Sequence, residues 1–499
     1  MIVLAILTGL LGILARIAIG RAAKASGRVD HYYWMLAAEA YRTQRGLPVH
    51  LPGKYLMEDE AQGYPPLFGL LLGRWRLDRG GVAAVIVLEL MQAVVLAALM
   101  SAFGAARSVI ALAVAIYAAA PVLVMYNTQL NSRILGDLFL FAAMAAEVSA
   151  AFVVPGSPLA LVLWCAAALL TALVIMTHKM TLQLRLALLL PWAWALGTPM
   201  PIAVCVAGLA VYVAIVGTRF ARYQFLTHWE FIRFWNRHWP ALGAHQFRDS
   251  LVYGGGLATS VGRLHQPGLR GALRQLRVVL AYAPLNLVLP LASMATATWP
   301  PNWLLVWLLG IYAWALATLV IPRLKCLGGG HLYVFNAVAP GACYLAFLPE
   351  GPVILEVLGV GILITAASLW IAWRMTRART PLLDEKFSQA VAVLGGLPKG
   401  RVAVLPTQGA EAVAWATHHA VLWGAHGYGL AGIEGFFPVL TKPLSAFLRQ
   451  YNIDMVLSDD RFWRIGADTL RAEGVPAGRE QVFGHWRLTW CQSGAADVS

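Results

Sequence analysis

Charged residues are scarce in this chain. Only 12% of its 499 residues are Asp, Glu, Lys or Arg, whereas 59% are hydrophobic. An ordinary soluble domain carries about 25% charged residues. Disordered chains and proteins that coat nucleic acid need a high density of charge, so the composition excludes both classes and indicates no nucleic-acid partner. It is typical of a membrane protein instead.

Acidic residues and cysteines are also few. The chain has 24 Asp and Glu against 38 Lys and Arg, so its net charge of +14 results from a shortage of acids. The cysteines lie far apart and mostly inside apolar runs, which excludes a metal knuckle and a disulfide framework. These cysteines are Cys165, Cys205, Cys326, Cys343 and Cys491.

Long apolar runs are abundant and predict about eleven membrane spans. The first run, residues 1–20, has neither a basic leader nor a small-residue cleavage site, so we expect it to stay as an uncleaved span. A shorter run covers 184–197. The other runs, each long enough to cross about 30 Å of hydrocarbon, begin near Val82, Val109, Ile134, Pro158, Met200, Val278, Asn302, His331 and Pro352.

Hydrophilic sequence is concentrated in two long loops, 21–81 and 218–277, and in the tail that follows Arg374. An odd number of spans and very short alternate connections put both loops and the tail on one side. The tail alternates short strand-like runs with helical spacing, which predicts a small α/β or α+β domain. We therefore expect an all-α polytopic membrane domain in residues 1–374 and a soluble domain in 375–499.

An acid, Asp30, follows the first span and begins a helical pattern that stops at Gly46 and Pro48. An acid at that position makes a good helix cap, because it accepts hydrogen bonds from unpaired backbone N–H groups. It could equally serve as a general base at the level of the lipid headgroups. The residues alone leave both interpretations open.

Three adjacent acids, Glu58, Asp59 and Glu60, stand near the end of the first loop. Hard divalent cations such as Mg²⁺ or Mn²⁺ prefer oxygen ligands, so the cluster could hold one. A solvated acidic turn is the alternative. Tyr64 follows this cluster and comes directly before two prolines that fix the chain as it re-enters an apolar helix.

Several cationic residues stand at predicted span ends on the side of the long loops. Arg133 and Asp137 are four apart on a helix and could form an ion pair, either structural or supporting a site. His178 and Lys179 end another span. Lys179 could simply reach to the interface, or it could bind a phosphate at the same depth.

The second long loop interleaves aromatic and basic residues around His228, Glu230 and Arg233. That composition is typical of a helix that lies along the lipid headgroups. The same residues could instead bind an acceptor at the membrane surface. Membrane anchoring and acceptor binding both remain open.

Three motifs together resemble the GT-C superfamily of polyprenyl-phosphate-dependent glycosyltransferases. They are Asp30 after the first span, YPPLF (Tyr64 to Phe68) at the end of the first loop, and SRILGD (Ser132 to Asp137) at the start of a later span. SRILGD is similar to the corresponding motif of protein O-mannosyltransferases. The first loop and THK (Thr177 to Lys179) are similar to the aminoarabinose transferases that modify lipid A.

The resemblance implies roles for these residues. Asp30 would be the catalytic base, and the acids late in the first loop would organise the donor phosphate or a metal. Lys179, Arg133, His178 and Tyr64 are then candidates for the donor phosphate. The chain departs from the lipid A enzymes in one respect, because Gly63 and Tyr64 stand where those enzymes have Glu-Lys before the two prolines.

The implied reaction is the inverting transfer of a sugar from a lipid-phosphate donor to a lipid, glycan or protein acceptor. The family places the active face and the tail outside the cytoplasm, in the periplasm or on the extracellular side of the inner membrane. The positive-inside rule points the other way, but it weakens for loops of about 60 residues. A lipid transporter or flippase and a non-catalytic scaffold are the rival hypotheses.

Overall fold

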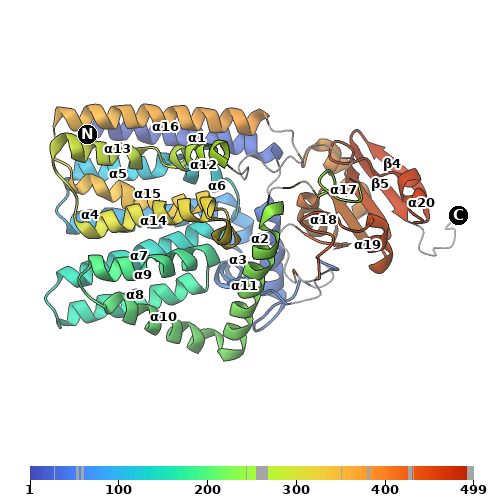
Figure 1. Cartoon of the computed structure of the whole chain (residues 1–499), viewed down its shortest axis with the longest axis horizontal. Helices are drawn as coiled ribbons and strands as arrows, with labels where there is room; N and C mark the ends of the chain where they lie inside the picture. The colour runs from blue at the N-terminus through green and yellow to red at the C-terminus, as the bar shows by residue number, and fades with distance from the viewer. Residues whose placement is uncertain are drawn as a thin grey trace.

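Long apolar helices form one part of the molecule, and a small mixed sheet with its own helices forms the other (Figure 1). This computed structural model describes residues 1–26, 29–51, 55–57, 61–242, 244, 246–253, 268–349, 351–378, 382–424, 430 and 432–491.

Six of the described helices are long and apolar enough to cross a membrane, or up to eight if each of two bent helix pairs is one span. The expected eleven spans are therefore not confirmed by length and composition. The run that begins at His331 differs most, since it folds as three short helical pieces rather than one. Pro340 lies in the middle piece, α15 (Val338–Cys343), and proline removes a backbone donor from a helix.

The helices of the bundle and its loops are α1 (Ile2–Ser26), α2 (Val29–Thr43), α3 (Leu67–Trp75), η1 (Leu77–Gly80), α4 (Val82–Ala102), α5 (Arg107–Ala119), α6 (Pro121–Tyr126), α7 (Arg133–Phe152), α8 (Pro158–Ile175), α9 (Lys179–Ala195), α10 (Met200–Val216), α11 (Thr218–His238), η2 (Trp239–Ala241), α12 (Gly268–Tyr282), α13 (Leu285–Thr296), α14 (Asn302–Val320), η4 (Pro322–Leu327), η5 (Gly330–Ala337), α15 (Val338–Cys343), η6 (Tyr344–Phe347) and α16 (Pro352–Ala378).

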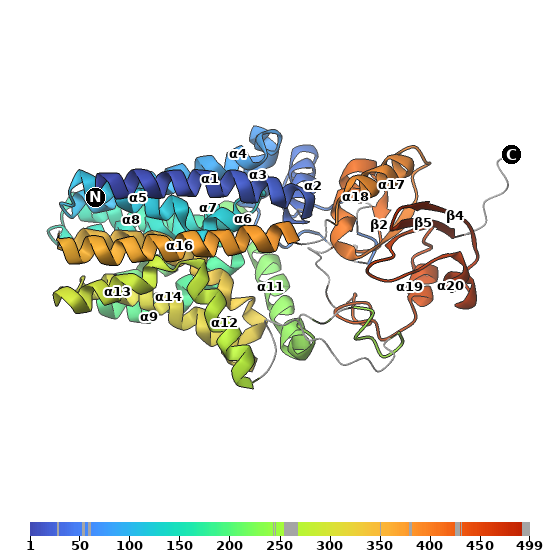
Figure 2. The same cartoon turned by 90° about the horizontal axis from the view of Figure 1, so that it is seen from above.

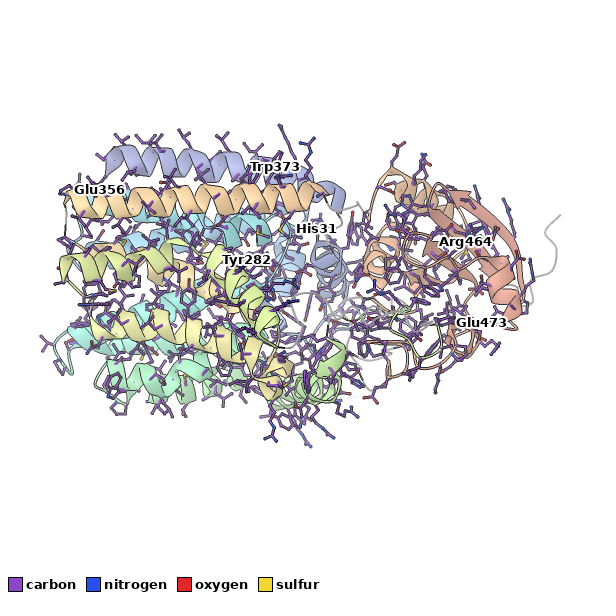
Figure 3. The ribbon with its side chains drawn as sticks, turned by 45° about the horizontal axis from the view of Figure 1, so that its top comes forward. His31, Tyr282, Glu356, Trp373, Arg464 and Glu473 are labelled. Carbon is purple, nitrogen blue, oxygen red and sulfur yellow. The ribbon has the colours of Figure 1, made fainter. Side chains whose placement is uncertain are left out.

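The N-terminus lies at one end of the bundle, and the C-terminal domain lies beyond the other (Figures 1 and 2). Helix α16 runs the full length, with Glu356 at the far end and Trp373 near the domain (Figure 3). Helices α2, α3 and α11 lie at the domain end. The two long loops and the tail thus share one end of the bundle, as the parity of the predicted spans requires.

Two ion pairs link helices inside the bundle. Arg185 of α9 and Glu147 of α7 form a fully buried ion pair, and Trp192 donates a hydrogen bond of 2.6 Å to the same carboxylate. Arg16 of α1 pairs with Glu89 of α4 at 2.7 Å. A charge in a low-dielectric interior is costly unless it is compensated, and these two ion pairs connect neighbouring helices.

The C-terminal domain contains a five-stranded sheet in the order β2-β1-β3-β5-β4. Strand β1 pairs in parallel with β2 and β3, while β5 is antiparallel to β3 and β4. The elements are α17 (Glu385–Gly395), β1 (Arg401–Leu405), η7 (Thr407–Gly409), α18 (Ala410–Thr417), β2 (Ala420–Val421), α19 (Leu444–Gln450), β3 (Met455–Asp459), α20 (Ala467–Ala472), β4 (Ala477–Phe483) and β5 (Trp486–Cys491).

The first long loop adds a short extended segment to this sheet. Tyr55 forms a parallel bridge with Val421, and the backbone N–H of Met57 donates to the carbonyl of Leu422 at 3.0 Å. The Met57 side chain is buried in the apolar core of the domain, together with Phe234 of α11. Both long loops are thus built into the C-terminal domain.

We predict that Arg185→Met strongly destabilises the protein. The change leaves the Glu147 carboxylate buried without its cation, which costs about 3 to 5 kcal/mol for a buried pair. Thermal unfolding of the purified protein in detergent measures the effect.

Arg185→Met combined with Glu147→Gln should recover much of the lost stability, since the neutral amide needs no counter-ion. Glu356→Gln, which changes an exposed acid on α16, is the matched control and should have little effect. A double variant no more stable than Arg185→Met would contradict this account.

Candidate functional site

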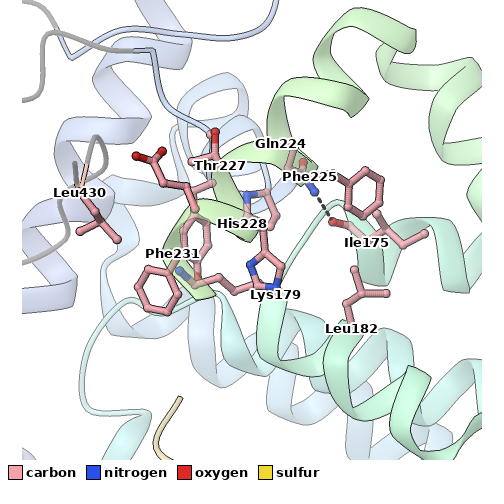
Figure 4. A pocket seen from close by; sticks show the side chains of 13 residues that line it. Ile175, Lys179, Leu182, Gln224, Phe225, Thr227, His228, Phe231 and Leu430 are labelled. Atoms are coloured by element: carbon pink, nitrogen blue, oxygen red, sulfur yellow. Dashed lines mark hydrogen bonds between the residues drawn. The ribbon is translucent and has the colours of Figure 1, made fainter. Parts of the chain in front are cut away.

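A pocket lies at the domain end of the bundle, beneath α11 (Figure 4). It contains about 530 Å³ of empty space, part of it open to the surroundings. The first loop, the end of α8, the start of α9, one face of α11 and the C-terminal domain all contribute to it. The lining residues are Gly63, Tyr64, Pro65, Ile175, Lys179, Leu182, Gln224, Phe225, Thr227, His228, Glu230, Phe231 and Leu430.

Lys179 is the cation of this pocket. Its ammonium lies 3.5 Å from the centre of the Phe231 ring and 5.4 Å from that of Tyr64. Among the described residues, no carboxylate lies within ion-pair distance of it. An aromatic face attracts a cation but does not neutralise it, so the positive charge stays available to an anion.

The N-terminus of α9 adds to this positive field. His178 caps the helix, since its side chain accepts from the backbone N–H of Thr181, and Lys179 is the first helical residue. Unpaired N–H groups and the helix dipole make such a terminus attractive to an anion. Burial, together with the neighbouring charges of Arg133 and Lys179, holds the pKa of His178 well below its usual range. The imidazole is therefore neutral.

Close packing joins the two motifs of the sequence analysis. A Cβ atom added to Gly136 of SRILGD would lie 2.8 Å from the Cβ of His178 in THK. Only glycine allows α7 to approach the start of α9 so closely. The glycine of SRILGD thus places Arg133 on the same side as Lys179, and both charges act on His178.

Arg133 does not pair with Asp137, so the expected ion pair is wrong. Two atoms of its guanidinium, Nε and Nη1, are buried without a hydrogen-bond partner, and its Cζ lies 5.1 Å from the centre of the Tyr126 ring. Asp137 lies one turn deeper, where it accepts hydrogen bonds from Gln92 at 2.6 Å and from Asn336. Amides from two other segments therefore occupy the carboxylate that sequence spacing assigned to Arg133.

The Tyr64 hydroxyl lies near Ser132, Arg133 and Asp30. It lies 3.4 Å from the hydroxyl of Ser132, next to Arg133 in the chain. The pKa of Tyr64 is raised to about 12, mainly by burial; the hydrogen bond with Ser132 and the charge of Arg133 oppose this shift, and the charge of Asp30 contributes to it. The hydroxyl therefore stays protonated and can donate a hydrogen bond. Asp30 and Arg133 are both close enough to act on this one group.

Asp30 lies within the first turn of α2, which begins at Val29. It is therefore inside the helix rather than at the position before it. The structure describes neither Gly27 nor Arg28, so the cap of α2 lies outside the described residues. The helix-cap and general-base interpretations of Asp30 both stay predictions.

The predicted acceptor residues divide between two faces of α11. His228 and Glu230 line the pocket, whereas Arg233 is exposed and does not. Burial and the charge of Lys179 lower the pKa of His228 to about 4, so this imidazole is neutral as well. It lies 3.1 Å from the side-chain amide of Gln183.

The proposed metal ligands Glu58, Asp59 and Glu60 lie outside the described residues. Within the described part of the chain, no group of three His, Cys, Asp or Glu residues could hold a metal ion. The cation site stays a prediction.

Sequence reasoning missed Phe231, the residue nearest to Lys179. A signal was present, because Gln224, Thr227, His228 and Phe231 recur at helical spacing and all line the pocket. Of these four residues only His228 is titratable. The sequence pattern of this face was therefore not recognised among the aromatic and basic residues around it.

Comparison by sequence gives no relative, since no model of a protein family and no curated protein matches the chain. Comparison by structure gives several similar proteins. The apo oligosaccharyltransferase of Archaeoglobus fulgidus is similar over 91% of this chain and 69% of its own, with a TM-score of 0.56 and 12% identity. ArnT of Cupriavidus metallidurans bound to undecaprenyl phosphate is similar over 96% of this chain and 97% of its own, with a TM-score of 0.55 and 11% identity.

A third structure, AglB of Archaeoglobus fulgidus with an inhibitory peptide and a dolichol-phosphate, has a TM-score of 0.52 at 11% identity. The oligosaccharyltransferase AglB and ArnT are both polyprenyl-phosphate-dependent glycosyltransferases of the GT-C superfamily. Identities this low show a shared fold and no more. This chain therefore has the fold of the GT-C glycosyltransferases, as its motifs suggested.

Proposed function

We propose that this protein is an integral membrane glycosyltransferase that moves a sugar from a polyprenyl-phosphate donor to a lipid, glycan or protein acceptor. The observation that supports this best is the pair of cations, Lys179 and Arg133, held at one end of the bundle. Both lie near Tyr64, and neither pairs with a carboxylate of the described residues. A phosphate is the anion that such a site fits, and it is consistent with the ligands of the two structural neighbours.

The donor phosphate would lie between these groups. The proposed hydrogen-bond donors are the Lys179 ammonium, the Nε and Nη1 atoms of Arg133 and the start of α9, and the Tyr64 hydroxyl, which contacts Ser132, lies beside them. These donors stabilise the charge that develops on the phosphate as the bond to the anomeric carbon breaks. His178 is neutral and serves to hold the start of α9 in place.

Asp30 is the proposed base. It would take a proton from the acceptor hydroxyl or amine while the acceptor oxygen or nitrogen forms its bond to the anomeric carbon. Attack opposite to the departing phosphate inverts the configuration at that carbon. The charge of Asp30 acts on Tyr64, and this supports a position of the proposed base near the proposed phosphate site.

The acceptor would enter from the side of α11. His228 and Glu230 line the pocket there, and Leu430 of the C-terminal domain closes it. We propose residues 1–374 as the transmembrane domain and 375–499 as a soluble domain that completes the pocket. Whether the sugar is a hexose or a pentose depends on groups that would surround the donor, and a divalent cation on the first-loop acids stays part of the proposal.

We further propose eleven crossings and an active end outside the cytoplasm. Several segments shorter than a standard span would cross within the bundle, where neighbouring helices satisfy their polar groups. The crossing segments are α1, α4, α5 with α6, α7, α8, α9, α10, α13, α14, η5 to η6, and α16.

Labelling of introduced cysteines tests this orientation. In a variant with Cys165 and Cys205 replaced by Ala, Gln408→Cys in the C-terminal domain should react with a membrane-impermeant thiol reagent in intact cells. Arg107→Cys, at the opposite end of the bundle, should react only after permeabilisation. Both positions are exposed. The reverse pattern would overturn the orientation.

Asp30→Asn should lower the transfer rate by roughly two to four orders of magnitude, the usual contribution of a general base. The amide has the size of the carboxylate, so folding should survive. The measurement is the recovery of surface glycans and the consumption of lipid-linked saccharides in cells that lack the gene.

Asp468→Asn is the matched control, because Asp468 also lies in the first turn of a helix but is 96% exposed in the C-terminal domain. It should restore the glycans fully. Near-normal activity of Asp30→Asn would remove Asp30 from the role of base.

Lys179→Met should weaken binding of a lipid phosphate by about 1.5 to 3 kcal/mol, the value of a hydrogen bond to a charged group. Methionine keeps the apolar stem against Phe231 and removes the charge. Binding of polyprenyl phosphate to the purified proteins measures the difference.

Lys325→Met is the matched control, since Lys325 also lies over an aromatic ring, 5.5 Å from the centre of Trp239, but does not line the pocket. It should bind the lipid phosphate as the wild type does. Equal affinities of the wild type and Lys179→Met would mean that Lys179 does not contact the phosphate.

A further inference from the structure

A row of arginines follows one side of α12. Arg270, Arg274 and Arg277 are spaced by four and three residues, which places them on one face of the helix, and all three are exposed. None of them lines the pocket described above.

A row of leucines lies next to the arginines. Leu269, Leu273 and Leu276 are 77%, 47% and 37% exposed, and they recur at the same spacing one position earlier. The other side of α12 is buried, with Val279 fully covered, and it packs against α14, η5 and α16. Helix α12 therefore has an exposed cationic face and an exposed apolar face side by side.

The position of α12 puts these faces at the edge of the bundle. Helix α12 bends by 81° into α13, so it does not continue the direction of that helix. It slants outward beside α14 (Figure 2), and Tyr282 at its end lies in the half of the bundle nearer to the C-terminal domain (Figure 3). The depth is that of the long loops, where the apolar bundle meets the aqueous domain.

We propose that α12 binds the headgroups of anionic phospholipids of the surrounding leaflet. The arginines contact lipid phosphates, and the leucines lie among the upper parts of the acyl chains. A helix with this arrangement is stable at the interface, because apolar burial and attraction to anionic lipid act together. This is a site distinct from the donor pocket.

The length of the arginine row on α12 favours the lipid leaflet, rather than a single phosphate ion, as the binding partner. Residues 270 to 277 span about 10 Å along a helix, which is more than one phosphate group covers. The exposed leucines add an independent reason, since a soluble anion offers them nothing to contact. Lipid provides both the negative charge and the apolar surface.

The same helix is connected to the proposed donor site. The hydroxyl of Tyr282 lies 3.1 Å from that of Tyr126, whose ring faces the Arg133 guanidinium. Lipid bound along α12 therefore holds a helix whose end contacts the residue that positions Arg133. This connection rests on the proposed function, but the lipid site itself does not.

Photo-crosslinking tests the proposal. The full-length protein is placed in nanodiscs that contain phosphatidylcholine and phosphatidylglycerol, with a photoreactive acyl chain on one lipid at a time. Crosslinks to 268–282 are then quantified by mass spectrometry after digestion with a protease that does not cut at arginine. In the wild type, phosphatidylglycerol should crosslink to α12 roughly tenfold more than phosphatidylcholine, since each arginine near the surface attracts anionic lipid.

The combined variant Arg270→Gln, Arg274→Gln and Arg277→Gln should lose this preference and keep the crosslink to phosphatidylcholine, because the leucines remain. A control variant removes three exposed cations of the C-terminal domain instead and should keep the preference. Its substitutions are Lys442→Gln, Arg464→Gln and Arg479→Gln.

Three results would overturn the proposal. They are equal crosslinking of the two lipids in the wild type, a preference that persists without the three arginines, and no crosslink of either lipid to α12. The first and third are read from the wild type, so they hold even if the arginine variant fails to fold. None of the outcomes depends on sugar transfer.

Discussion

The cost of holding a charge in a low-dielectric interior determines how this molecule is arranged. Arg185 and Arg16 are compensated by carboxylates inside the bundle, where they connect neighbouring helices. Lys179 and Arg133 face aromatic rings instead. An aromatic ring attracts a cation but does not neutralise its charge, so such a cation can still bind an anion. The contrast between these two pairs of cations separates the scaffold of the protein from its proposed site.

The C-terminal domain contributes to that site through α11. Phe234 and Trp235 of α11 contact Phe437 of the domain, with ring centres 6.3 and 5.7 Å apart. One turn earlier on the same helix, Phe231 covers Lys179. The C-terminal domain thus holds α11, which lines the pocket, in place. Leu430 of the same domain also lines the pocket. A separate soluble unit attached only by a linker could not do this.

Much of this arrangement could be predicted from the sequence, and the limits have physical causes. Apolar runs, short connections and span parity placed the loops and the tail at one end. The motifs SRILGD and THK meet because Gly136 permits close packing against His178. A glycine in a helix does not itself indicate which segment packs against it, so this contact could not be predicted from the sequence. The pairing of Arg133 with Asp137 failed because spacing along one helix says nothing of Gln92 and Asn336, which reach Asp137 from other segments.

The bridge between the first loop and the edge of the sheet has a consequence for how the protein is made. Tyr55 donates a hydrogen bond to Glu411, a residue 356 positions later in the chain, and pairs with the neighbouring strand. Contacts of such long range form slowly, because the intervening chain must first be in place. Every candidate span of the described chain ends before Glu411, so the partner of this loop is synthesised after all of them. The proposed site is therefore completed at the end of synthesis, so an unfinished or truncated chain would reach the membrane without a working pocket.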